Sequence, residues 1–96
     1  MFLVALHLLA SIDIECVARC RASLSSADSL LLLGDGVYAL QSEETLTSLT
    51  AATNNLFVLA EDLLCRLPHL DTSISVINYA QWVQLSIASA PVVSWY

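Results

Sequence analysis

The chain has 96 residues, of which 57% are apolar and 12% charged, more apolar surface than one small domain can bury. Part of that surface is therefore expected to meet other protein chains. Three arginines, no lysine and nine acids give a net charge of −6, which excludes a nucleic-acid reader that holds phosphates through a basic patch.

The opening segment MFLVALHLLASI is an apolar run that could be mistaken for a signal peptide. It has neither a basic n-region nor an A-x-A cleavage site, and about ten apolar residues are too few to span a bilayer. We expect residues 2–9 to form a first buried strand of a cytoplasmic protein, with His7 in a structural role rather than a catalytic one. An odd number of cysteines, three, indicates reduced thiols.

Short apolar runs and amphipathic segments then alternate along the chain. A first helix follows with Ser11 or Asp13 as its N-cap, and Ile14, Val17, Ala18 and Leu24 can share one side of it. A shorter helical period covers residues 46–52, and another helix runs over residues 61–67, before a proline. The further strands are expected at 30–33, 56–59, 74–77 and 92–95.

The clearest predicted helix begins at Asn78, which caps it together with Gln81 three residues on. Pro91 ends this segment. Its expected apolar face is Tyr79, Trp82, Val83, Ile87 and Ala90.

Strict alternation of strand and helix predicts right-handed crossovers and a parallel sheet covered on both faces. The expected fold is α/β, a single three-layer domain over residues 1–96 with five mostly parallel strands.

The Gly34-Asp35-Gly36 turn directly follows four leucines. Turns at the carboxyl ends of buried strands are common ligand sites in open α/β sheets, so a phosphate loop, a catalytic turn and a subunit-joining turn are the alternatives. Phosphate binding is disfavoured because the turn holds an acid and no nearby base. Asp35 fits turn formation better than general-base catalysis.

Four residues, Cys16, Cys20, Cys65 and His69, have the right count for a zinc site. Pro68 prevents Cys65 and His69 from sharing a helical face, and C-x₃-C is not a zinc knuckle. We therefore expect no metal and no cofactor, and cysteines that pack as small apolar residues.

Cys20 has two interpretations. Arg19 and Arg21 flank it, and nearby positive charge lowers a thiol pKa, which favours a nucleophile or persulfide carrier. Its shared helix side with Val17 and Leu24 favours a thiol at the edge of the core.

Three blocks of the chain carry a family resemblance. A leucine strand leads into Asp-Gly-Val, a second strand leads into Glu-Asp-Leu, and a Tyr-x-x-Trp-Val helix precedes a near-terminal Trp; these are LLLLGDGVYAL, LFVLAEDLLCRL and SISVINYAQWVQLSIASAPVVSW. In this pattern the chain resembles the TusB/DsrH family, small subunits of cytoplasmic sulfur-relay complexes. Trp82 stands where the family usually has Phe, and Arg66-Leu67-Pro68 replaces a frequent Arg-Gly.

The resemblance implies a flavodoxin-like sheet and assembly with TusC-like and TusD-like partners into a dimer of heterotrimers. It implies a relay of persulfide sulfur toward 2-thiolation of the tRNA wobble uridine, with the principal cysteine on the TusD-like subunit and this chain as a structural subunit. The alternative is a DsrH-like subunit in sulfur oxidation, carrying persulfide on Cys20, which stands fifteen residues before Asp35 as in DsrH-like members. A stand-alone ligand-binding domain is a third possibility.

Interface roles are expected at two places. The turn with Asp35 and Gly36 would shape an inter-subunit surface, as the resemblance implies. Trp95 ends the expected last strand and Tyr96 follows it. These two aromatic residues would anchor an interface or cover the end of the core.

Overall fold

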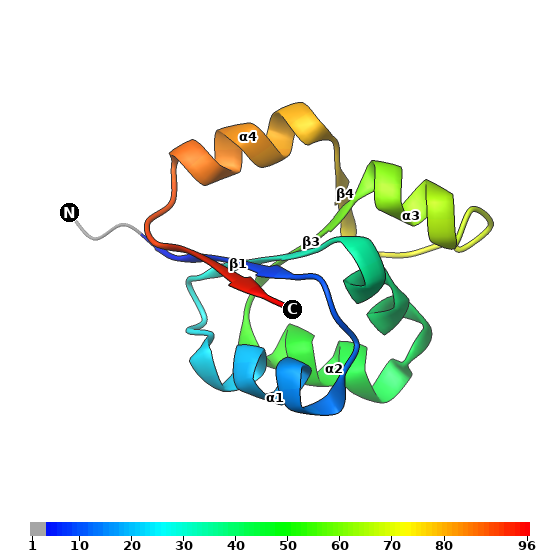
Figure 1. Ribbon diagram of the computed structural model, residues 1–96, viewed down its shortest axis with the longest axis horizontal. Helices are drawn as coiled ribbons and strands as arrows, with labels where there is room; N and C mark the ends of the chain where they lie inside the picture. Colours follow the sequence, from blue (N-terminus) through cyan, green and yellow to red (C-terminus); the bar gives the residue numbers. More distant parts are fainter. Residues whose placement is uncertain (1–3) are drawn as a thin grey trace.

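The computed structural model describes residues 4–96, so residues 2 and 3 of the expected first strand lie outside the described part. Five parallel strands form one sheet in the order β4-β3-β2-β1-β5 (Figure 1). The strands are β1 Leu6–Leu9, β2 Ser29–Leu32, β3 Asn55–Leu59, β4 Ser75–Ile77 and β5 Val92–Trp95.

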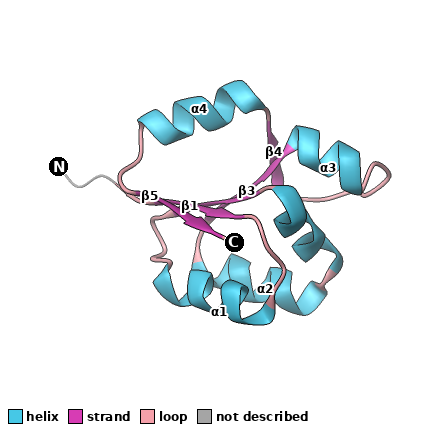
Figure 2. Cartoon of the chain, in the orientation of Figure 1, coloured by secondary structure: helices cyan, strands magenta, loops and turns pink. Residues whose placement is uncertain are grey.

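Helices cover both faces of the sheet (Figure 2). The steps from β1 to β4 all move in one direction, so right-handed crossovers put their connecting helices on one face. The chain must then return from β4 at one edge to β5 at the other, which places α4 alone on the opposite face. The helical elements are α1 Ile14–Ser23, the 3₁₀ segment η1 Gly34–Gln41, α2 Glu43–Ala52, α3 Ala60–Arg66 and α4 Tyr79–Ile87.

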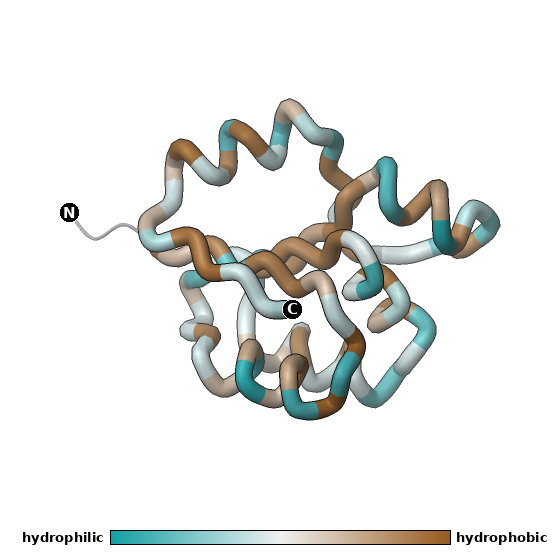
Figure 3. The backbone as a smooth tube through the Cα atoms, in the orientation of Figure 1, coloured by the Kyte–Doolittle hydropathy of each residue, from teal (hydrophilic) through white to brown (hydrophobic). Residues whose placement is uncertain are grey.

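Two apolar clusters lie on the two faces of the sheet, whose strands form the apolar centre of the chain (Figure 3). Alternate residues of β2 point to opposite sides: Leu30 and Leu32 pack toward α1, α2 and α3, and Leu31 packs toward α4. Because both faces of each central strand are buried, the strand sequence is continuously apolar rather than alternating.

The predicted α/β class, single layered domain and five-stranded sheet are confirmed, and every strand pair is parallel. The layers are flavodoxin-like, although the strand order differs from the 2-1-3-4-5 order of flavodoxin. The capping box of Asn78 and Gln81 is present, with each side chain accepting from the other residue's backbone N–H at 2.8 Å.

The predicted face of the first helix is wrong in part. Asp13 is the N-cap, and Cys16 and Cys20 form the buried side of α1. Ile14 is 85% exposed, and Ala18 is also exposed. Both lie two residues from Cys16, about 200° around the helix, so they point away from the sheet.

The predicted apolar face of α4 is also wrong in part. The side chains that reach the core are those of Trp82 and Leu85, and no residue of α4 is fully buried. Tyr79, Val83 and Ile87 are exposed instead.

The 3₁₀ segment η1 has no counterpart among the predicted elements. Among residues 4–96, no helix has the length and apolarity needed to cross a membrane.

Candidate functional site

The Gly34-Asp35-Gly36 turn lies at the carboxyl edge of the sheet, where β2 passes into η1. Gly34 has a φ of +53°, the left-handed region that glycine adopts without strain. A Cβ on Gly36 would collide with the backbone carbonyl of Leu9 at the end of β1. Both glycines are therefore required by the backbone path, one for its conformation and one for close approach of η1 to β1.

This turn is held by two side chains of α3. The backbone N–H of Gly34 donates a hydrogen bond of 2.7 Å to Oδ2 of Asp62. Arg66 is within 3.4 Å of Asp35 through Nε and within 3.5 Å of Asp62 through Nη1. Asp35 is exposed and faces one arginine, an arrangement that pairs the carboxylate rather than preparing it as a base.

Asp62 is a site residue that the sequence interpretation missed. The sequence does show Asp62 as an acid in the first turn of the helix that follows β3, where the helix dipole favours a carboxylate. Its second role, as acceptor for Gly34 28 positions earlier, depends on the proximity of β2 and β3 in the sheet.

Cys20 lies in the core, away from this edge. α1 begins after β1 at the carboxyl edge and runs back along the sheet, so Cys20 in its second half is distant along the helix from the turn that contains Asp35. The Cys20 side chain is fully buried. Burial, together with nearby Cys16, raises the pKa of the Cys20 thiol to about 12. The thiol is therefore protonated near neutral pH.

The four residues weighed as zinc ligands do not form a site within the part of the chain that is described. Cys16 and Cys20 are buried under the sheet, whereas Cys65 is exposed on α3. Across residues 4–96, no three His, Cys, Asp or Glu side chains cluster as a metal ion would require.

A polar chain that is buried at His7 and half-buried at Trp95 joins three distant segments. Trp95 Nε1 donates a hydrogen bond of 3.0 Å to Nδ1 of His7, and Nε2 of His7 lies 3.3 Å from Oδ2 of Asp28. An indole N–H can only donate, so Nδ1 of His7 is the acceptor and the ring proton is on Nε2, directed at Asp28. This geometry orients His7 as a structural residue.

Asp28 is the centre of this network. Burial acts to raise its pKa, but hydrogen bonds from the backbone N–H groups of Ser25 and Ala5, both at 3.0 Å, and from His7 outweigh burial and lower it. Its backbone carbonyl also accepts from the Thr53 hydroxyl. Asp28 thus links the loop after α1 to β1 and to the start of β3.

The structure brings some of the predicted site residues together. Gly36 contacts the end of β1 at Leu9, and the next residue, Ala10, donates its N–H to the carbonyl of Trp95 at 2.9 Å. Tyr96 follows directly and is 87% exposed. The turn and the C-terminal aromatics therefore flank the same strand end, and Cys20 does not join them.

The described geometry defines a small parallel α/β domain whose glycine turn is braced by an acidic helix start and whose first-helix cysteine is buried. The family described as DsrH like protein matches residues 12–92. Protein TusB of Erwinia tasmaniensis is 36% identical over 75 residues, which cover 75% of this chain and 79% of that protein. The chain belongs to the DsrH-like family.

Proposed function

We propose that this chain is a structural subunit of a cytoplasmic sulfur-relay complex that passes persulfide sulfur toward 2-thiolation of the tRNA wobble uridine. Its partners would be TusC-like and TusD-like chains in a dimer of heterotrimers. The similarity to Protein TusB over three quarters of the chain supports the relay assignment. With only three basic residues, this subunit would not itself hold tRNA.

The burial of Cys20 is the observation that supports a structural rather than a catalytic role. In persulfide transfer a thiolate attacks the outer sulfur of a donor persulfide, a new S–S bond forms, and the donor cysteine leaves as a thiolate. Because burial raises the pKa of the Cys20 thiol to about 12, the thiol is protonated near neutral pH and supplies little of the thiolate that this attack needs. A donor persulfide would also need to reach a fully buried sulfur atom.

A surface for partner chains is available beside the carboxyl edge. Ile12 and Ile14 are 53% and 85% exposed at the start of α1. They border a hollow of about 500 Å³ between α1 and α2, which Arg21 and Glu44 also line. Exposed apolar residues rimmed by polar side chains support an interaction surface at this place.

The second candidate is a DsrH-like subunit that carries persulfide on Cys20. The spacing of fifteen residues between Cys20 and Asp35, together with the family match, favours it. In that case α1 would have to move away from the sheet to expose the sulfur.

The structural role is tested by complementation and co-purification. Expressed in a bacterial strain that lacks its own tusB gene, the chain is expected to restore 2-thiouridine in tRNA, measured by mass spectrometry of nucleosides.

An affinity-tagged copy should co-purify TusC-like and TusD-like chains. Ile14→Asp should reduce that yield at least fivefold, whereas Thr47→Asp, an exposed change on α2, should not. Absence of both restored thiolation and co-purified partners would exclude this proposal.

A further inference from the structure

His7 lies within β1 and has a different hydrogen-bond partner on each ring nitrogen. Nδ1 accepts from the indole N–H of Trp95 at 3.0 Å, and Nε2 lies 3.3 Å from Oδ2 of Asp28. The partners come from opposite sides of β1, because Trp95 ends β5 and Asp28 directly precedes β2. Only 3% of His7 is exposed, so water is a poor substitute for either partner.

The two partners favour opposite protonation states of the His7 ring. An indole N–H can only donate, so Trp95 needs a lone pair on Nδ1, which a doubly protonated ring lacks. Both this N–H and this lone pair lie in the planes of their rings, and the interplanar angle of 14° suits the bond. A carboxylate accepts more strongly from an imidazolium than from a neutral ring. Protonation of His7 therefore weakens the contact with Trp95 and strengthens the contact with Asp28.

Asp28 is ionised over the range in which histidines ordinarily change charge, about pH 5 to 8. Burial acts to raise its pKa from 3.8, but hydrogen bonds from the backbone N–H groups of Ser25 and Ala5 and from His7 outweigh burial and lower it. Its carboxylate thus provides a counter-ion for protonated His7. The present separation of 3.3 Å exceeds the roughly 2.7–2.9 Å of a charge-assisted hydrogen bond, so the ring can move closer.

The other elements packed against β1 bring no charged side chain to this ring within residues 4–96. His7 shares a face of β1 with Leu9, two residues on, and α1 covers that face with the thiols of Cys16 and Cys20. Burial, with nearby Cys16, raises the pKa of the Cys20 thiol to about 12, so this thiol is neutral below pH 8. The charged side chains of α1 and η1 are exposed: Glu15, Arg19, Arg21 and Asp35.

The strand that depends on the Trp95 contact is β5. It is an edge strand whose neighbour in the sheet is β1, and its residues are half-buried or exposed. At its carboxyl end, the N–H of Ala10 donates to the carbonyl of Trp95 at 2.9 Å. We propose that His7 is a pH-sensitive switch for β5: the neutral ring holds the Trp95 end of β5 against β1, and the protonated ring releases it in exchange for an ion pair with Asp28. This switch does not rest on the relay assignment.

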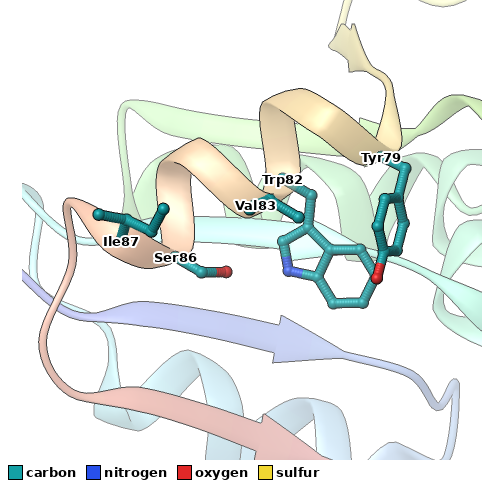
Figure 4. Close-up of a pocket in the computed structure, with 5 residues that line it drawn as sticks. All are labelled: Tyr79, Trp82, Val83, Ser86 and Ile87. Carbon is teal, nitrogen blue, oxygen red and sulfur yellow. The ribbon is translucent and has the colours of Figure 1, made fainter.

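The two tryptophans of the chain allow the switch to be tested with an internal reference. Trp82 on α4 meets Tyr79 edge to face, with centroids 5.6 Å apart, beside a hollow of about 320 Å³ (Figure 4). Residues 72–96 contain no Asp, Glu, Lys, Arg or His. In ¹⁵N-labelled protein taken from pH 8 to pH 5, the indole N–H resonance of Trp95 should move with the same midpoint as the ring nitrogens of His7. The indole resonance of Trp82 should stay in place.

Backbone hydrogen exchange locates the release. The N–H of Ala10 donates from β1 to β5, whereas the N–H of Leu33 donates from the end of β2 to Leu9 of β1 at 3.1 Å. From pH 8 to pH 5, the protection factor of Ala10, corrected for the intrinsic pH dependence of exchange, should fall at least about fivefold. That of Leu33, at the same end of β1, should change less than about twofold.

Three variants complete the test. His7→Gln should abolish the response of Ala10 to pH, whereas His69→Gln, at the other histidine of the chain, should preserve it. Trp95→Phe should give low protection at Ala10 at both pH values, because the bond that protonation breaks is already absent; it decides the matter if His7→Gln does not fold. A Trp95 resonance that does not follow His7, equal loss of protection at Ala10 and Leu33, or a pH response that survives in His7→Gln or Trp95→Phe would each overturn the proposal.

Discussion

The indole Nε1 of Trp95 donates a hydrogen bond of 3.0 Å to Nδ1 of His7, across 88 positions of sequence. The two rings are also nearly parallel, with an interplanar angle of 14° and centroids 6.2 Å apart. Since β5 lies beside β1, this contact fastens the last strand to the first within one domain. Trp95 therefore helps to close the core of its own chain, against which it is half-buried, and Tyr96 is exposed at the position where an interface role is expected of the C-terminal aromatics.

Trp95→Phe should destabilise the domain by about 1–3 kcal/mol, because Nδ1 of His7 would remain buried without a donor. The free energy of unfolding in urea measures this change. Tyr96→Phe is the matched control and should alter it by less than about 0.5 kcal/mol, since that side chain is 87% exposed. Equal effects of the two substitutions would contradict the role assigned to the Trp95–His7 bond.

Asp28 should make stability fall on acidification. Its folded-state pKa is lowered from the ordinary value of 3.8, so its ionised form contributes stability that is fully present above that value. This contribution is lost as pH falls below 3.8 and through the lowered folded-state pKa. Urea unfolding at pH 7 and at steps down to pH 2.5 measures the loss.

Asp28→Asn provides the comparison for that acid dependence. An amide has one acceptor oxygen, so it cannot serve both the Ala5 and Ser25 N–H groups, which the carboxylate accepts on separate oxygens. The variant should be less stable at pH 7 by about 1–3 kcal/mol and should approach the wild type at low pH. Parallel pH profiles for the two proteins would rule out Asp28 as the source.

Gly36→Ala should be severely destabilising, by at least about 3 kcal/mol, because the new Cβ meets backbone rather than a movable side chain at Leu9. Thermal unfolding measures the loss. Gly34→Asn is the informative control: its φ of +53° strains most residues, but asparagine tolerates that region, so we expect about 1 kcal/mol. If Gly36→Ala folded as well as Gly34→Asn, close approach to β1 would not be what requires Gly36.

Cys20→Ser should leave most sulfur transfer intact if this chain is structural. The variant replaces the wild-type chain in the reconstituted complex, and mass spectrometry follows tRNA thiolation and sulfur adducts. We expect the buried hydroxyl to lower the free energy of unfolding by about 1–3 kcal/mol. We expect no persulfide on this subunit in either the wild type or the variant. Cys65→Ser controls for adventitious modification of the exposed thiol. A one-sulfur mass gain at Cys20, lost together with activity in the serine variant, would favour the carrier alternative.

Local chemistry in the sequence was sufficient to predict most of the elements. The continuous leucines of β2 indicate a strand buried on both faces, and the capping box at Asn78 sets the start of α4 through residues three positions apart. Alternation of such elements determined the α/β class, because crossover handedness leaves few arrangements. These signals act over a few neighbouring residues, so sequence alone can reveal them.

Only the tertiary structure decided how distant residues meet. The Gly34 N–H donates a hydrogen bond to Asp62, and Gly36 cannot carry a side chain because the backbone of Leu9 lies against it. Both contacts follow from the order of the strands in the sheet. Periodicity marked α4 as amphipathic but could not tell which apolar residues meet the core. That depends on how the helix rotates as it crosses the sheet, and its rotation packs the half-buried Trp82 against the core while leaving Val83 at the surface.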